Sequence, residues 1–418
     1  MIEITYDVIV VGAGPAGLAA AAEAKKSGAE WVAVIERDNQ PGGILQQCIH
    51  PGFGLEYFRE ELTGPEYAQR FIEAARREKV EFYFNTMALD FDASDNTLVC
   101  SCSKGLYRMK AGSFVLAMGC RERTRANLVI PGSRPAGIYT AGTAQRLLNV
   151  QGYNVGKNII ILGSGDIGMI MARRMTLEGA TVKAVVEIMP FLAGLKRNKV
   201  QCLDDFHIPL FLSHTIVDIT GVDRVESVTV APVNENREPV LEKSEVIPCD
   251  TVLFSVGLIP ENELTQTADL TLNSVTRGVS VNQFMQTENP SIFACGNVLH
   301  VNDLVDHVTR EGEIAGFYAA RHAKGELKNS AAISAHAGAN VRYVCPQKIA
   351  LIEEQMENVT LFFRVLRPQK NVEIVVLGDG EVIHRKKTLS VNPGEIESVE
   401  ISNSLIEGLT DKVTVEIR

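Results

Sequence analysis

The sequence predicts an α/β fold class with two similar strand–turn–helix–strand units, followed by a C-terminal all-β module. Two glycine-rich turns of one pattern begin at Gly12 and Gly163, each between an apolar run and a helix-forming segment. Beyond about residue 340 the apolar residues alternate with a period of two, which is typical of strands. A chain of 418 residues is also long enough for about three domains.

The first unit occupies the start of the chain. An apolar run at 8–11 predicts a parallel strand buried on both faces, and a glycine-rich turn and a helix follow it. In a dinucleotide-binding turn the glycines allow a tight bend, close approach of a pyrophosphate and close helix–strand packing. Glu36 ends the next strand, where an acid accepts a hydrogen bond from a ribose hydroxyl. The turn residues expected to contact a dinucleotide are Gly12, Gly14, Pro15, Ala16 and Gly17.

The second unit repeats this order from residue 158 and ends at Glu187. Gly12 and Glu36 are 24 positions apart, and so are Gly163 and Glu187. Because two accidental turns would not share this order and spacing, we predict two Rossmann-like three-layer dinucleotide-binding domains. Both acids suit a free 2′-hydroxyl, so the second site is expected to take NAD rather than NADP. Its expected contacts are Gly163, Gly165, Asp166, Ile167, Gly168 and Glu187.

Composition excludes several classes of protein. The formal net charge of −10 disfavours nucleic acid as a partner, because phosphates repel an acidic surface. The chain has no apolar run of about 18 residues for a membrane span and no signal-peptide pattern at its start. The eight cysteines are scattered without zinc-site spacing. We therefore expect a cytoplasmic protein without a metal site.

Two such units at these positions resemble the two-dinucleotide-binding-domain flavoproteins, the pyridine nucleotide–disulfide oxidoreductases. Three further segments, 113–119, 251–262 and 292–297, look like the strand-and-glycine motifs of that family. The resemblance implies that the first turn binds FAD, the second binds NAD, and the NAD domain is inserted into the FAD domain. The expected divisions are an FAD-binding domain at 1–122 and 263–325 and an NAD-binding domain at 123–262.

The resemblance also extends both cofactor sites. It adds Gly257 to the NAD site. Asn297 stands where the family has an aspartate beside the ribityl chain, so we expect a weaker contact there. A helix at 313–321 is expected to point its positive N-terminal dipole at the flavin. The further FAD contacts that the resemblance implies are Glu36, Arg37, Gly42, Gly43, Met87, Met118, Gly119, Gly296, Asn297, Thr309, Arg310 and Glu311.

The cysteines beside the expected flavin depart from the family pattern. Disulfide reductases of this family need two cysteines there, whereas this chain has Cys48 alone in one of the two usual positions and none at 137–148, the other. A dithiol relay is therefore not expected. Cys48 and His50 are a candidate catalytic pair, because positions i and i+2 of a strand share one face. The favoured alternative is that Cys48 is a packed thiol and His50 is a loop histidine, neither of them catalytic.

Segments 119–123 and 141–146 resemble a narrower branch, the FAD/NAD subunits of opine oxidase, hydrogen cyanide synthase, heterotetrameric sarcosine oxidase and glycerol 3-phosphate oxidising systems. This implies hydride transfer between NAD(H) and FAD within the electron-transfer subunit of a metabolite dehydrogenase or oxidase. The expected partner is a second redox subunit. The alternative is a free-standing NADH oxidase or reductase that uses oxygen or a small acceptor.

The tail is expected to be a linker at 326–340 and a β-sandwich module at 341–418, plausibly immunoglobulin-like. Gly378, Asp379 and Gly380 predict a hairpin turn between two of its strands. The module carries no chemical motif. Docking to a partner, association with a second copy of the chain and simple stabilisation all remain open.

Overall fold

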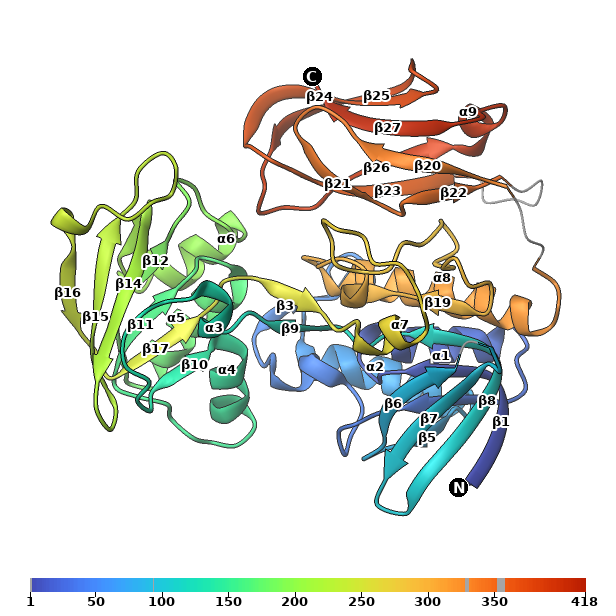
Figure 1. Cartoon of the computed structure of the whole chain (residues 1–418), viewed down its shortest axis with the longest axis horizontal. Helices are drawn as coiled ribbons and strands as arrows, with labels where there is room; N and C mark the ends of the chain where they lie inside the picture. Colours follow the sequence, from blue (N-terminus) through green and yellow to red (C-terminus); the bar gives the residue numbers. More distant parts are fainter. Residues whose placement is uncertain (1, 93, 328–330, 352–357) are drawn as a thin grey trace. The chain divides into compact units, whose positions relative to one another are not determined.

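The computed structural model describes residues 2–92, 94–327, 331–351 and 358–418 and divides the chain into two compact units (Figure 1). The first unit comprises 1–120 and 260–418, and the second comprises 121–259. The second unit is therefore an insertion in the chain of the first.

A mixed sheet with the strand order β5-β2-β1-β8-β7-β6, in which β19 also pairs with β8, organises the first unit. Strands β2, β8, β5 and β19 continue parallel from β1, so the central strands are covered on both faces and are almost wholly apolar. The elements of this unit before the C-terminal module are β1 (Ile2–Val11), α1 (Pro15–Lys26), β2 (Val32–Ile35), η1 (Gly43–Gln47), β3 (Pro51–Phe53), β4 (Leu62–Thr63), α2 (Gly64–Arg77), β5 (Glu81–Tyr83), β6 (Met87–Asp92), β7 (Thr97–Cys102), β8 (Gly105–Leu116), α7 (Glu263–Thr267), β19 (Ile292–Ala294), η4 (Gly296–Val298) and α8 (Val305–Ala323).

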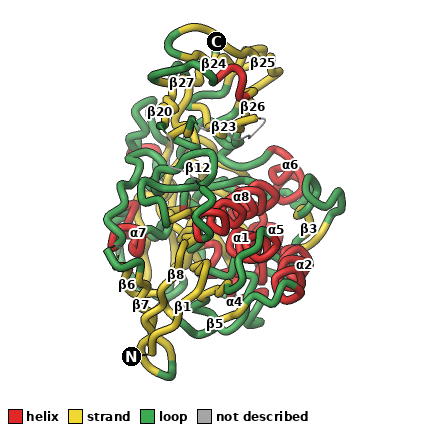
Figure 2. Tube along the Cα trace, turned by 90° about the vertical axis from the view of Figure 1, so that its right-hand side faces the viewer, coloured by secondary structure: helices red, strands yellow, loops and turns green. Residues whose placement is uncertain are grey.

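Helices α1 and α8 run side by side against this sheet (Figure 2). A Cβ on Gly312 would lie 2.3 Å from the Ala16 carbonyl oxygen, and one on Gly316 would lie 2.1 Å from that of Ala20. Glycine is therefore required where the two helices cross. The expected start of this helix at residue 313 is wrong, because Gly312 is a packing contact inside a helix that begins at Val305. Within the described ranges, no helix combines the length and apolarity needed to cross a bilayer.

The second unit contains a parallel sheet with the order β10-β17-β11-β12-β13 and an antiparallel sheet with the order β14-β15-β16. Strand β11 is buried from Ile159 to Leu162, as its apolar run predicts. The elements are α3 (Arg125–Leu128), β10 (Ile138–Thr140), α4 (Ala141–Asn149), β11 (Asn158–Leu162), α5 (Asp166–Leu177), β12 (Thr181–Glu187), α6 (Lys196–Lys199), η2 (Val200–Asp204), β13 (Leu210–Leu212), β14 (His214–Gly221), β15 (Val225–Pro232), η3 (Leu241–Lys243), β16 (Glu245–Pro248) and β17 (Thr251–Phe254). The two boundaries between the units fall within two short strands, β9 (Cys120–Glu122) and β18 (Leu258–Pro260).

The C-terminal module is all-β apart from one short helix, and its two sheets enclose one hydrophobic core. One sheet has the order β22-β20-β27-β24-β25 and the other β21-β23-β26. The elements are β20 (Ala332–Ala337), β21 (Val341–Cys345), β22 (Lys348–Ala350), β23 (Asn358–Val365), β24 (Gln369–Gly378), β25 (Glu381–Val391), β26 (Glu397–Ser402), α9 (Asn403–Ile406) and β27 (Lys412–Ile417).

Two sequence expectations for the module have different outcomes. The hairpin turn is confirmed, because Gly378 pairs with Glu381 while Asp379 and Gly380 have φ angles of 49° and 96°, as a type I′ turn requires. The linker at 326–340 is wrong, because β20 lies inside it. Most residues of β20 are small, and Ile333 is its single large buried side chain, so the sequence pattern of a strand is weak here. Residues 328–330 of that expected linker lie outside the described residues.

Candidate functional site

The first glycine turn has the geometry of a dinucleotide-binding loop. Gly12 has a φ of 105°, and a Cβ there would lie 2.4 Å from the carbonyl oxygen of Ala117. A Cβ on Gly17 would lie 1.8 Å from the Gly12 carbonyl oxygen. A Cβ on Gly14, in contrast, would meet no described atom within 4 Å. The turn therefore packs tightly on both sides and leaves open space at Gly14, where α1 begins and its N–H groups favour an anion.

Two distant segments pack against this turn. The Gly42 N–H donates to the Ala13 carbonyl oxygen at 2.8 Å, and a Cβ on Gly43 would lie 2.9 Å from the Gly14 Cα. A Cβ on Gly296 would lie 2.9 Å from the Ala16 Cβ. The structure thus brings together three of the glycine motifs that the sequence placed in one site.

Glu36 is 8% exposed and braces the same turn. Its Oε2 accepts a hydrogen bond from the Ala13 N–H and its Oε1 one from the Asp38 N–H, both at 2.8 Å. The Glu36 carbonyl oxygen also accepts from the Thr86 N–H at 3.0 Å, which brings the neighbouring Met87 to this edge. Each carboxylate oxygen keeps a second lone pair with which it can accept from a ribose hydroxyl.

Three other expected contacts lie along the same edge of the sheet. Met118 and Gly119 directly follow Ala117, whose carbonyl oxygen faces Gly12, and both are partly buried. Arg37 is exposed directly after Glu36. These positions agree with a cofactor site that extends from the first turn.

The expected contacts at 309–311 lie inside α8 rather than at its start. The Thr309 hydroxyl forms a 2.7 Å hydrogen bond with that of Tyr67, and Glu311 Oε2 accepts from the Gly296 N–H at 2.7 Å. Arg310 is exposed. Since α8 begins at Val305, its N–H groups with the positive dipole lie about one turn before these residues.

Two buried polar atoms close to the start of α8 test whether a flavin fits there. Asn302 Oδ1 and His307 Nδ1 have no hydrogen-bond partner among the residues that the structure describes. An unsatisfied buried polar atom costs about 1–3 kcal/mol, so a group that supplies donors and acceptors is expected beside them. Asn297 directs its own Oδ1 to the Asn302 N–H at 2.9 Å. A flavin ring edge has the hydrogen-bonding groups that this region needs.

The structure does not favour Cys48 and His50 as a catalytic pair. They follow the 3₁₀ helix η1 instead of lying in a strand, so the shared face that motivated the pairing is wrong. Burial raises the pKa of the Cys48 thiol to about 12, so the thiol is protonated near neutral pH. Cys48 Sγ lies 3.3 Å from the Ile44 carbonyl oxygen, and the His50 ring packs 5.1 Å from that of Phe53.

The second glycine turn repeats the first. Gly163 has a φ of 102°, and a Cβ there would lie 2.0 Å from the Ser255 carbonyl oxygen. A Cβ on Gly168 would lie 2.7 Å from the Gly163 carbonyl oxygen. Glu187 is 5% exposed and accepts from the backbone N–H groups of Ser164 and Met189, both at 2.9 Å. The repeat therefore includes the hydrogen bonds of the terminal acid as well as the spacing.

Segment 193–198 also contacts the second turn, and sequence reasoning missed it. The Ala193 N–H donates to Ser164 Oγ at 2.9 Å. The carboxylate of Asp166, which we expected to contact NAD, accepts from the Leu195 N–H at 2.9 Å. Gly194 was the one available signal, because a Cβ there would lie 2.8 Å from the Asp166 nitrogen.

Gly165, Ile167 and Gly257 complete the second set of expected residues. Gly165 and Ile167 are partly buried at the start of α5. Gly257 is exposed with a φ of 101°, and its carbonyl oxygen accepts from the Arg123 N–H at 3.0 Å. Gly257 thus lies two residues after Ser255, whose carbonyl oxygen packs against Gly163.

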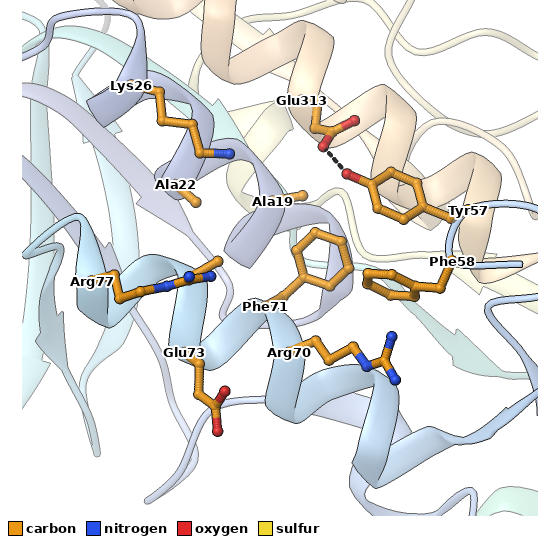
Figure 3. A pocket seen from close by; sticks show the side chains of 11 residues that line it. Ala19, Ala22, Lys26, Tyr57, Phe58, Arg70, Phe71, Glu73, Arg77 and Glu313 are labelled. Atoms are coloured by element: carbon orange, nitrogen blue, oxygen red, sulfur yellow. Dashed lines mark hydrogen bonds between the residues drawn. The ribbon is translucent and has the colours of Figure 1, made fainter. Parts of the chain in front are cut away.

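A separate cavity of about 260 Å³ is lined by residues of α1, α2 and α8 and by Tyr57 and Phe58 (Figure 3). The Tyr57 hydroxyl donates to Glu313, and Arg70 is paired with Glu60 and lies 4.6 Å from the centre of the Phe58 ring. The cavity contains none of the glycine-turn residues. Because Tyr57 and Arg70 are already paired with acids, we assign the cavity no ligand. Its lining residues are Ala19, Ala22, Lys26, Tyr57, Phe58, Arg70, Phe71, Glu73, Ala74, Arg77 and Glu313.

The fold and the two turns define a protein with two dinucleotide-binding folds, one inserted in the chain of the other. The chain belongs to the pyridine nucleotide-disulphide oxidoreductase family, which its residues 6–312 match. The family resemblance drawn from the sequence is therefore confirmed.

Relatives of several kinds share this family. The HcnB subunit of hydrogen cyanide synthase from Pseudomonas protegens is 23% identical over 318 residues, which are 71% of this chain and 66% of that protein. An opine oxidase subunit from Agrobacterium tumefaciens is 29% identical over 281 residues, 63% of this chain and 54% of that one. An NADH oxidase of Methanocaldococcus jannaschii is 26% identical over 341 residues, 78% and 70% of the two chains. The chain thus spans between half and two thirds of the first two relatives.

Solved structures agree on the fold. The thioredoxin reductase of T. acidophilum superposes with a TM-score of 0.62 at 22% identity, over 76% of this chain and 98% of that one. A NAD-dependent persulfide reductase from A. fulgidus gives a TM-score of 0.59 at 18% identity, over 90% of this chain and 68% of that one. At these identities the likeness concerns the fold alone.

Proposed function

We propose that the protein is an FAD-dependent oxidoreductase that transfers hydride between NAD(H) and FAD, with FAD at the first glycine turn and NAD at the second. The repeated turn carries this proposal, because both copies combine a first glycine packed against a strand-end carbonyl oxygen with a buried acid that braces the turn. A bound FAD would supply the hydride and electron chemistry that protein side chains lack.

The chain's own residues would bind and orient the cofactor. The start of α1 and the open space at Gly14 would accommodate a pyrophosphate, and Glu36 would accept a hydrogen bond from a ribose hydroxyl. Asn302 Oδ1 and His307 Nδ1, which lack partners among the described residues, would be available to hydrogen-bond with the ring system. The N-terminal dipole of α8 favours negative charge nearby, by about 1 kcal/mol.

Anaerobic titration of the purified chain with NADH tests the proposal. The flavin absorption band is expected to bleach rapidly, because hydride passes from the nicotinamide to the flavin. A colourless preparation that takes up no FAD, or a yellow one that NADH leaves unbleached, would contradict it.

The second site is proposed to prefer NADH over NADPH. The buried Glu187 carboxylate would repel a 2′-phosphate, and we expect NADPH to bind roughly tenfold more weakly or worse. The concentrations of NADH and NADPH that half-reduce the flavin measure this ratio. Glu187→Gln removes the charge and is expected to narrow the ratio, whereas equal affinities in the parent chain would refute the preference.

We also propose that the partner is a second redox subunit. Two relatives are named as subunits of an opine oxidase and a hydrogen cyanide synthase, and neither segment 42–51 nor segment 137–148 of the sequence has the two cysteines of a dithiol relay. The partner would oxidise a small metabolite of the opine, amino acid or glycerol 3-phosphate type. Co-purification of a second flavoprotein that restores electron flow would support this, and full turnover by the chain alone would argue against it.

A free-standing NADH oxidase is the second candidate. The relative from Methanocaldococcus jannaschii carries that name and matches 78% of this chain. Oxygen consumption by the isolated chain distinguishes the candidates. Sustained consumption with NADH favours the oxidase, and slow consumption that a redox partner bypasses favours the electron-transfer role.

The C-terminal module is proposed to be an immunoglobulin-like sandwich. Two sheets over one core and a two-residue hairpin support this assignment. Strands β20 and β27 pair in parallel, which departs from a purely antiparallel arrangement.

A further inference from the structure

Loop 296–304 leads from Gly296 to the start of α8, and the C-terminal module contacts it at His300, Val301 and Asp303. Asp303 is 14% exposed, and Arg364 of β23, equally buried, forms an ion pair with it. Arg364 Nη2 also donates to the Val301 carbonyl oxygen at 3.1 Å, and the Ile396 N–H donates to Asp303 Oδ2 at 2.6 Å. The module therefore holds both carboxylate oxygens of Asp303 and the backbone two residues before it.

A second line of contacts runs from the module to Gly296 itself. His300 is 1% exposed, and its Nδ1 lies 3.4 Å from the hydroxyl oxygen of Tyr343 in β21. The His300 Nε2 lies 3.0 Å from Glu311 Oε1, and Glu311 Oε2 accepts from the Gly296 N–H. Gly296 in turn packs against Ala16 at the start of α1. The contacts thus reach from β21 to the first glycine turn.

The remaining contacts between the module and the rest of the first unit are those expected of a domain held in a fixed position. The buried side-chain amide of Gln283 donates to and accepts from the backbone of Ala350, both at 2.8 Å. The ring of Phe362 lies 5.3 Å from that of His307. Tyr343 and Cys345 belong to the hydrophobic core of the first unit. A domain attached only for docking would not need to share a core with the fold that binds the cofactor.

We propose that the C-terminal module is a built-in part of the flavin site, and that Arg364, Tyr343 and His300 are positioning residues that hold loop 296–304 against the cofactor. The inference rests on the proposed binding of FAD at the first glycine turn. The loop carries Asn297 and Asn302, two side chains near the start of α8, so a loop released from the module would offer them in many conformations. Affinity and flavin environment would both suffer, because binding would have to order the loop.

The full-length chain carrying Arg364→Met tests the proposal, with Arg385→Met as the matched control. Arg385 lies in the same module and pairs with Glu373, but it is 53% exposed and belongs to β25. The FAD dissociation constant is expected to rise roughly tenfold or more in Arg364→Met, because a buried ion pair loses one partner. The control is expected to stay within about twofold of the parent.

A gentler variant covers the case in which Arg364→Met fails to fold. Tyr343→Phe removes one hydroxyl and leaves the ring in the core. At saturating FAD it is expected to keep the parent's melting temperature while it shifts the visible flavin spectrum and the flavin midpoint potential. A merely structural role for Tyr343 would leave both flavin signals unchanged.

The outcomes separate this inference from the proposed function. If the variants bind FAD as tightly as the parent and keep its flavin spectrum and midpoint potential, the inference is overturned. The proposed hydride transfer still stands in that case if NADH bleaches the parent. A parent that binds FAD but is not bleached by NADH overturns the proposed hydride transfer, and a weakened Arg364→Met then still supports the inference. A parent that binds no FAD overturns both.

Discussion

Burial decides which side chains of this protein can react. The two acids at the glycine turns are buried but braced by backbone N–H groups, so their lone pairs are oriented before any ligand binds. Cys48, in contrast, is partly buried, and desolvation raises the pKa of its thiol. His300 is buried beside an acid. Each environment has a measurable consequence.

Cys48 is expected to be unreactive in the folded protein. Because burial raises its pKa to about 12, little thiolate exists near neutral pH, and alkylation by iodoacetamide should be far slower than in the unfolded chain. Mass spectrometry of the peptide that contains Cys48 measures this rate. Cys48→Ser should leave bleaching by NADH within about twofold of the parent, whereas rapid native alkylation or lost bleaching would restore Cys48 as a catalytic candidate.

His300 is expected to make stability depend on pH. Burial alone would lower its pKa, but the neighbouring Cys345 and Glu311 raise the pKa well above its usual value. A raised folded-state pKa contributes stability that is complete below the unfolded value of about 6.5 and is lost as the pH rises through the folded value. Urea unfolding of the parent and His300→Gln from about pH 6 to about pH 9 should therefore show a difference that shrinks with rising pH. A difference that is constant or grows would contradict this assignment.

At the scale of elements, backbone proximity explains most of the glycine pattern. Both turns place a strand-end carbonyl oxygen where a Cβ of the first glycine would stand, at Ala117 in one unit and Ser255 in the other. Helices α1 and α8 approach so closely that Gly312 and Gly316 face backbone. These glycines are sites of close packing and not merely of flexibility.

Gly163→Ala is expected to impair the second site without removing the flavin. Its Cβ would lie 2.0 Å from the Ser255 carbonyl oxygen, so the turn must move, and the NADH concentration for half-reduction should rise roughly tenfold or more. Gly179→Ala is the control, because it shares a positive φ while its Cβ meets no described neighbour within 4 Å. A yellow Gly163→Ala protein that bleaches like Gly179→Ala would refute the role of the turn.

At the scale of the whole molecule, separate hydrophobic cores support the units and the module. The first unit has one continuous core in the fold that carries the first glycine turn and another in the C-terminal module, and the second unit has one core on each face of its parallel sheet. The module nevertheless adds Tyr343, Cys345 and Ala350 to the core of the first unit. We therefore expect the module to unfold together with the fold that carries the first glycine turn.

Phe363→Ala tests the module core. Phe363 is fully buried in β23, and loss of its ring should lower the free energy of unfolding by about 3–5 kcal/mol. Leu389→Ala, at an 83% exposed position of β25, should change it by less than about 0.5 kcal/mol. Guanidinium unfolding measures both variants, and a loss below about 1 kcal/mol for Phe363→Ala would contradict the packing.

Local patterns predicted the parts of the fold that local physics controls. The strand at 8–11, the two glycine turns and the hairpin at Asp379 and Gly380 are confirmed, because periodicity, positive φ and turn geometry depend on neighbouring residues. Two elements were mispredicted where distant packing overrides local preference. In the sequence, Gly312 indicates the boundary of a helix, but in the structure it is a packing contact with α1 inside the helix. The segment of β20 resembles a linker in the sequence, but it forms a strand because it pairs with β27.

The sequence by itself determined the glycines and acids of both turns, because each turn with its acid is encoded within about 25 adjacent residues. It also determined the family, from the combination of these turns with segments 113–119, 251–262 and 292–297. Only the tertiary structure decided that α8 begins at Val305, that Cys48 is a partly buried thiol with a raised pKa, and that the module reaches Gly296 through Tyr343, His300 and Glu311. These features join residues far apart in the chain. Burial, hydrogen bonding and charge pairing depend on neighbours in space, which a linear pattern does not specify.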